Sequence, residues 1–64
     1  MEDRPIVFTI SPRNDGSYVL YTRDGRVDEY NRETVFPANS LYNAMCFASK
    51  IYNDKGYAVL FEVD

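Results

Sequence analysis

The sequence predicts a two-layer α+β fold, with one helix packed on one face of a three- to four-stranded sheet. Two observations predict it. Apolar and β-branched residues gather in short runs at residues 5–11, 17–23 and 57–63, and turn residues separate the first two. Before the last run, apolar residues recur at helical spacing over about residues 41–53. Because a helix between two strands normally forms a crossover, the last strand is expected to run parallel to an earlier one.

The N-terminal half predicts a β-hairpin and a short third strand. The first strand is expected at residues 5–11, and residues 12–16 are rich in turn formers. The second strand is expected at residues 17–23. The dipeptide Asp24-Gly25 follows it and is typical of a two-residue hairpin loop. A third strand is therefore expected at residues 26–30.

A loop over residues 31–38 is expected to lead into the helix, which Asn39 or Ser40 can cap. Gly56 suits the left-handed position that ends a helix. Between these ends, one apolar stripe is predicted to face the sheet, formed by Leu41, Ala44, Met45, Ala48, Ile51 and Tyr52.

The last strand, expected at residues 57–63, is mostly apolar, which predicts a central or well-covered position. From the first strand, the residues expected to face the helix are Ile6, Phe8 and Ile10. From the last strand, the alternation of side chains allows two sets, either Tyr57, Val59 and Phe61 or Ala58 and Leu60.

Length and composition exclude several classes of chemistry. The chain has 64 residues and 7.4 kDa, so we expect residues 1–64 to form a single domain. It has no histidine, and Cys46 is its one cysteine, which excludes an intramolecular disulfide and a thiolate metal cage. Cys46 also lies in the middle of the predicted helix, with no histidine to activate it. We therefore expect a protein that is not an enzyme and needs no cofactor or metal.

The N-terminus and the hydropathy pattern predict a cytoplasmic protein. The first five residues, Met1 to Pro5, contain two acids and are not followed by an apolar segment with a cleavage site. No apolar run approaches the roughly 20 residues that a membrane-spanning helix needs.

The predicted helix is unusual because Lys50 is its one charged residue between Leu41 and Tyr52. Tyr42 and Cys46 fall on one flank of the apolar stripe, and Phe47 falls on the other. Two interpretations remain open. The flanks can pack under the loop at 31–38, beside Phe36, or they can form a surface for a partner or for a second copy of the chain.

Charge distinguishes the candidate partners. The formal net charge is −3 and the pI is near 4.7, which disfavours a general binder of phosphate backbones. The acids Asp28 and Glu29 are instead candidates to meet a basic groove on a protein. Tyr21 is a candidate contact on the sheet face that the helix leaves open. Exposed sheet tyrosines also allow an alternative function, the binding of single-stranded nucleic acid.

Two segments give the chain a layout that a broad class of small proteins shares. They are Val35-Phe36-Pro37-Ala38-Asn39-Ser40, which leads into the helix, and residues 56–63, which follow it. In size, acidity and order of elements the chain resembles the small regulators that phages encode to block host or defence proteins. The resemblance implies inhibition by occupancy of a target surface in the host cytoplasm. We expect a self-associating, dimeric, protein-binding regulator, with a structural or housekeeping domain as a further alternative.

Overall fold

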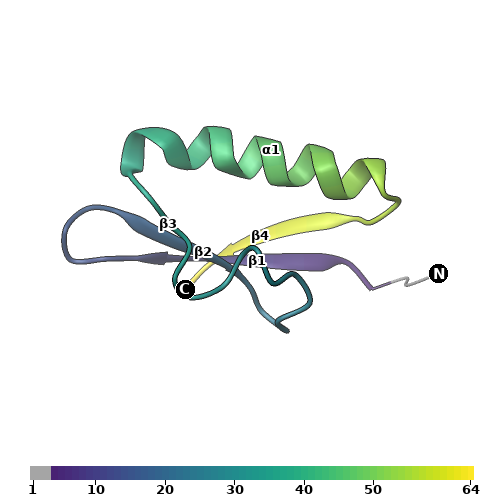
Figure 1. The fold of residues 1–64 in the computed structure, drawn as a ribbon, viewed down its shortest axis with the longest axis horizontal. Coiled ribbons are helices and arrows are strands. Elements are labelled where there is room, and N and C mark those ends of the chain that lie inside the picture. The colour runs from purple at the N-terminus through teal and green to yellow at the C-terminus, as the bar shows by residue number, and fades with distance from the viewer. Residues whose placement is uncertain (1–3) are drawn as a thin grey trace.

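The computed structural model describes residues 4–64 and has a four-stranded mixed sheet with one helix on one face (Figure 1). This is the predicted α+β class. The elements are β1 (Ile6–Pro12), β2 (Tyr18–Thr22), β3 (Val35–Phe36), α1 (Leu41–Asp54) and β4 (Val59–Val63). The N-terminal residues Met1, Glu2 and Asp3, on which the argument against a signal peptide partly rested, lie outside the described residues.

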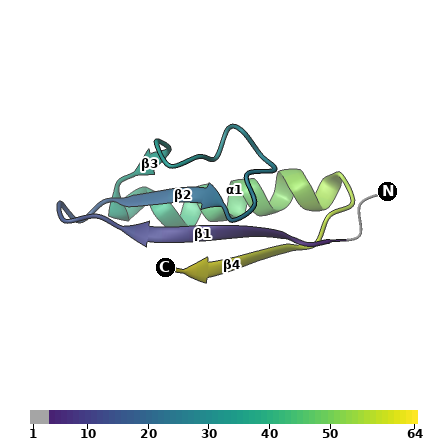
Figure 2. The same cartoon turned by 90° about the horizontal axis from the view of Figure 1, so that it is seen from below.

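The order of strands across the sheet is β3-β2-β1-β4 (Figure 2). Strands β1 and β2 form the predicted antiparallel hairpin, in which Ile10 lies opposite Leu20. Strand β4 runs parallel to β1, with Phe8 opposite Phe61. The prediction that the helix forms a crossover between parallel strands is therefore confirmed.

The core lies between β1, β2 and α1. Ile6, Phe8 and Ile10 are buried under the helix, as the alternation predicted. The ring of Phe8 is fully buried and contacts the rings of Tyr30 and Phe61, with centroids 5.2 Å and 5.4 Å away. The predicted helix stripe also packs on this core. On the last strand, the structure selects the set that contains Phe61, which consists of Tyr57, Val59 and Phe61.

The prediction of a third strand at residues 26–30 is wrong. Asp24-Gly25 does not close a two-residue hairpin, because the Asp24 carboxylate accepts the Arg26 N–H at 3.2 Å and starts a longer loop. Val27 turns inward and is buried. The chain returns beside β2 at Tyr30, whose C=O accepts the Thr22 N–H at 3.1 Å, and again at Thr34, whose C=O accepts the Leu20 N–H at 3.0 Å. The third strand is the short β3, which follows.

The helix α1 begins and ends where the sequence predicted. Ser40 is the N-cap residue, but its side chain makes no capping hydrogen bond, and a 3-10 turn at Ala38–Ser40 leads into the helix instead. At the C-terminal end, Gly56 has φ +97°, the left-handed conformation that only glycine adopts at little cost.

The prediction of a central or well-covered last strand is also wrong. β4 is an edge strand, and Leu60 and Val63 are 53% and 73% exposed. Its apolar composition reflects pairing with β1 on one side and contact with the core through Val59 and Phe61. The other edge of the sheet is β3, which is 2 residues long.

Candidate functional site

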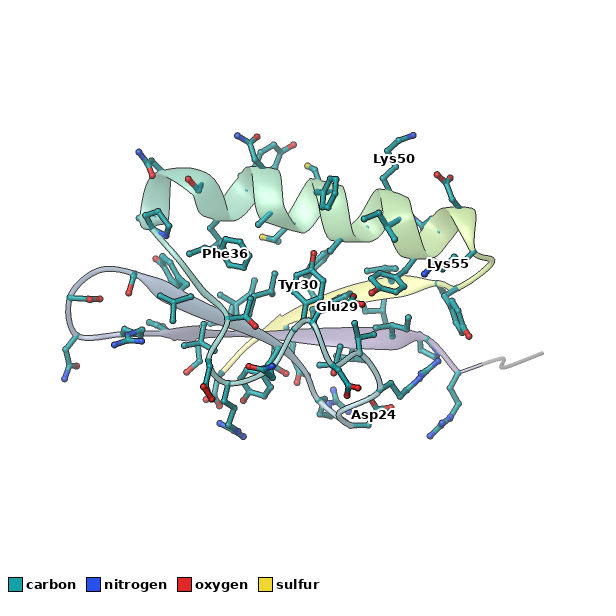
Figure 3. The ribbon with its side chains drawn as sticks, viewed as in Figure 1. Asp24, Glu29, Tyr30, Phe36, Lys50 and Lys55 are labelled. Carbon is teal, nitrogen blue, oxygen red and sulfur yellow. The ribbon has the colours of Figure 1, made fainter. Side chains whose placement is uncertain are left out.

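The surface of α1 that points away from the sheet exposes large apolar side chains. Tyr42 is 74% exposed and Phe47 is 62% exposed, and Cys46 is exposed between them. Tyr30 and Phe36 point instead into the space between sheet and helix (Figure 3). The interpretation in which these flanks pack under the loop is therefore wrong. We call Tyr42, Asn43, Cys46 and Phe47 the outer surface of α1.

This outer surface carries no charge. The sequence has no charged residue between Glu33 and Lys50, a stretch that includes β3 and the first two turns of α1. Lys50 points away from the sheet (Figure 3), and its ammonium lies 3.9 Å from the Asp54 carboxylate one turn further on. The charged groups of the helix are thus confined to its C-terminal half, where they pair with each other.

The flank of α1 nearer β4 is slightly hollowed. A depression of about 380 Å³ lies between the helix and the edge strand, and its lining includes Tyr42, Met45, Cys46, Lys50 and Phe61. Hydrogen bonding to Cys46, and then the negative charge of its ionised sulfur, raise the pKa of the Tyr42 hydroxyl. Phe47 lies on the opposite flank, because it is one residue, about 100°, further round the helix than Cys46.

The acidic candidates lie in the loop between β2 and β3. Glu29 turns toward the helix, where its carboxylate accepts the Tyr52 hydroxyl at 2.8 Å. Asp28 is exposed, and its backbone carbonyl accepts a hydrogen bond from the Asn31 side chain. The sequence interpretation placed these two acids on a solvated strand, which is incorrect because the segment forms turns. Glu29 has a structural role that the sequence did not suggest.

Tyr21 lies on the sheet face that α1 leaves open, as predicted, but it is only 9% exposed. The guanidinium of Arg32 lies over its ring, 4.3 Å from the centroid. Beside it, Arg23 forms a bidentate ion pair with Glu62 of β4, and the Thr9 hydroxyl donates to the same carboxylate at 2.8 Å. A network of charged and polar groups therefore covers much of the open face.

The other strand tyrosine does not join Tyr21. Tyr18 lies opposite Phe36 and packs, like Tyr57 before β4, against the core on the helix side. Among the strands that the structure describes, Tyr21 is the one aromatic side chain on the open face. Binding of single-stranded nucleic acid by a row of stacked tyrosines has no geometric support on this face.

The predicted site residues thus fall in three places. Tyr42, Cys46 and Phe47 share the outer surface of α1, Asp28 and Glu29 lie in the loop after β2, and Tyr21 lies across the sheet. Sequence reasoning missed the Arg23–Glu62 pair, because it joins residues 39 apart through the parallel pairing of β1 with β4.

The residues at 4–64 bring together no group of three or more histidine, cysteine, aspartate or glutamate side chains suited to a metal ion. Within the same residues, α1 is too short and too polar to cross a bilayer. Comparison of the chain with protein-family models, curated protein sequences and solved structures finds no match.

Proposed function

We propose that this protein is a small binding protein without chemistry of its own, and that it acts by docking the outer surface of α1 into an apolar groove on another protein. The observation that supports the proposal most directly is the exposure of Tyr42 and Phe47 on the first two turns of α1, which carry no charge; Lys50 follows one turn after Phe47. Aromatic side chains are enriched, and charged side chains are depleted, at the centre of a protein interface.

The geometry suits helix-in-groove recognition. The residues of the outer surface form two adjacent rows on a rigid helix, with Tyr42 next to Cys46 on one flank and Asn43 next to Phe47 on the other. Tyr42 and Phe47 lie about 140° apart around the helix axis, so the proposed groove has to enclose most of the exposed side of the helix. Burial of an exposed phenylalanine side chain is worth about 1.5–3 kcal/mol. Tyr42 and Phe47 are thus large enough to act as the two anchors of an interface.

Charge indicates what surrounds the groove. The loop between β2 and β3 contains four acids and three arginines, so its own formal charge is −1, and the chain has a net charge of −3. The acids are Asp24, Asp28, Glu29 and Glu33. A groove lined with apolar residues and bordered by lysine or arginine would be complementary to this surface. Occupancy of such a groove by a small acidic protein is the mode of action of an inhibitor, and we propose the same role here, in the setting of a phage-encoded regulator.

Site-directed crosslinking tests the proposal. A photoreactive residue at position 42 is expected to yield a discrete protein adduct in a cell extract, whereas the same residue at Asn14, in the β1–β2 turn, is not. Phe47→Asp is expected to abolish the adduct without unfolding the chain. Equal labelling from both positions, or an adduct that persists in Phe47→Asp, would contradict the proposal.

A further inference from the structure

The two edges of the sheet differ in how they are protected. β3 is only 2 residues long and is followed directly by Pro37, and both features discourage pairing with another strand. β4 is 5 residues long and contains neither proline nor lysine. Within residues 4–64 no strand pairs with its outer side, so β4 is the unprotected edge.

The backbone of β4 offers hydrogen-bonding groups along this edge. The Ile6 N–H donates to the Ala58 C=O and the Asp64 N–H donates to the Ile10 C=O, each at 2.8 Å. Because a parallel ladder uses alternate residues of a strand, the even-numbered residues of β4 bond to β1. The N–H and C=O groups of the odd-numbered residues therefore point outward, and these residues are Val59, Phe61 and Val63.

The side chains of the edge are apolar or already neutralised. Leu60 and Val63 are exposed on opposite faces of the strand. Glu62 is the one charged residue of β4, and Arg23 pairs with its carboxylate on the open face. A strand that pairs with this edge therefore meets no unpaired charge.

From this geometry we infer that the occupant of the edge is a second copy of the chain, and that the two β4 strands pair antiparallel about a two-fold axis at Phe61. Val59 then lies opposite the second copy's Val63, and Phe61 lies opposite its own equivalent. Each of these pairs exchanges both backbone hydrogen bonds, so the two sheets become one continuous sheet.

Avoided repulsion between carboxylates favours this register over its neighbours. With Phe61 at the axis, Glu62 lies directly opposite the second copy's Leu60. The two Glu62 side chains are then diagonal neighbours on the open face, where each is already paired with the Arg23 of its own chain. A shift that brings the axis to Glu62 would place two glutamates directly opposite, which is destabilising. A shift that brings the axis to Leu60 would place Val63 opposite Tyr57, whose N–H already donates to the Tyr52 C=O.

The pairing has a consequence for the proposed function. Residues directly opposite in an antiparallel pair point to the same face, so both α1 helices lie on one side of the joined sheet. The dimer would present two outer surfaces of α1 in the same direction. The inference itself rests on the edge of β4 and not on the proposed function.

Sedimentation equilibrium with two matched variants tests the inference. The 7.4 kDa chain is expected to sediment at twice that mass. Leu60→Glu would face the second copy's Glu62 and is expected to weaken the dimer roughly tenfold, because the repulsion occurs twice by symmetry. Leu60→Lys also puts a charge on the edge, but its attraction to the second copy's Glu62 offsets the cost, so it is expected to weaken the dimer less than Leu60→Glu does. Circular dichroism verifies that both variants fold, which the exposure of Leu60 favours.

The other outcomes overturn the inference. A wild-type chain that stays monomeric at millimolar concentration excludes the dimer. Equal weakening by both Leu60 variants excludes this register, and loss of the dimer in Phe47→Asp moves the contact to the helix. The crosslinking test at position 42 detects an adduct with a different protein, so it is independent of the dimer. Absence of the dimer in sedimentation does not affect the crosslinking result, and absence of a crosslink does not affect the sedimentation result.

Discussion

The hydroxyl of Tyr52 on α1 donates a hydrogen bond of 2.8 Å to the carboxylate of Glu29, 23 residues earlier in the chain. Tyr52 is 7% exposed, and its ring also packs near Phe8 at a centroid distance of 6.0 Å. This bond ties the irregular loop between β2 and β3 to the helix. Burial first, and then the bond to Glu29, raises the pKa of Tyr52 to about 12.

The raised pKa of Tyr52 predicts a loss of stability in alkali. In the unfolded chain the tyrosine pKa is near its ordinary value of 10. The folded state therefore holds the proton more tightly, and this contribution is complete below pH 10 and is lost as the pH rises toward 12. We expect the free energy of unfolding, measured in urea, to fall by on the order of 2 kcal/mol over that window.

Two variants separate the causes of this alkaline loss. Tyr52→Phe removes the titrating group, so the alkaline fall is expected to shrink even though the variant is itself about 1 kcal/mol less stable at pH 7. Glu29→Gln removes only the negative charge, and the pKa of Tyr52, followed by its ultraviolet absorbance, is expected to move down toward 10. An unchanged Tyr52 pKa in Glu29→Gln would show that burial alone sets it.

Phe8 is predicted to be the most sensitive core position. Its side chain is fully buried and meets the rings of Tyr30, Tyr52 and Phe61. Phe8→Ala is expected to cost about 3–5 kcal/mol, because it removes this contact and leaves a cavity. A domain of this size has little stability to spare, so the variant should be largely unfolded by circular dichroism at 25 °C. The matched control is Val7→Ala on the open face, whose expected cost is smaller.

The neighbours Ala48 and Phe47 are predicted to respond in opposite ways to the same substitution. Ala48 is fully buried against the sheet, so Ala48→Asp forces a carboxylate into the core and is expected to unfold the chain. Phe47 is 62% exposed, so Phe47→Asp is expected to change stability by less than about 1 kcal/mol. Thermal unfolding of the two variants measures the difference. If Phe47→Asp also unfolds the chain, the outer surface of α1 is not free in solution.

The features that the sequence predicted correctly depend on residues close together in the chain or on a general rule of topology. The stripe of α1 follows from the helical spacing of Leu41, Ala48 and Tyr52, and Gly56 marks the end of the helix because of its backbone freedom. The parallel position of β4 follows from the crossover rule.

The features that it missed depend on contacts between distant residues. The position of the third strand depends on where the chain returns to β2, which the bond from Leu20 to Thr34 fixes. The edge position of β4 could not be told from its composition, because an apolar strand is equally compatible with the middle of a sheet. For the candidate site, helical spacing placed Tyr42, Cys46 and Phe47 on the flanks of the helix, where the structure exposes them, but it could not show that Arg32 covers Tyr21.

The lowered pKa of Glu62 on the open face predicts a loss of stability in acid. Hydrogen bonds from Arg23, and then from Thr9, hold the pKa of Glu62 below its ordinary value of 4.5. The stability from this pairing is present above pH 4.5 and is lost as the pH falls through the lowered pKa. Urea unfolding at pH 6 and pH 3 is expected to show a smaller acid loss for Glu62→Gln than for the wild type. Asp54→Asn, in the exposed pair with Lys50, should leave the acid loss unchanged. If the two variants behaved alike, the Arg23–Glu62 pair would be no stronger than an ordinary surface pair.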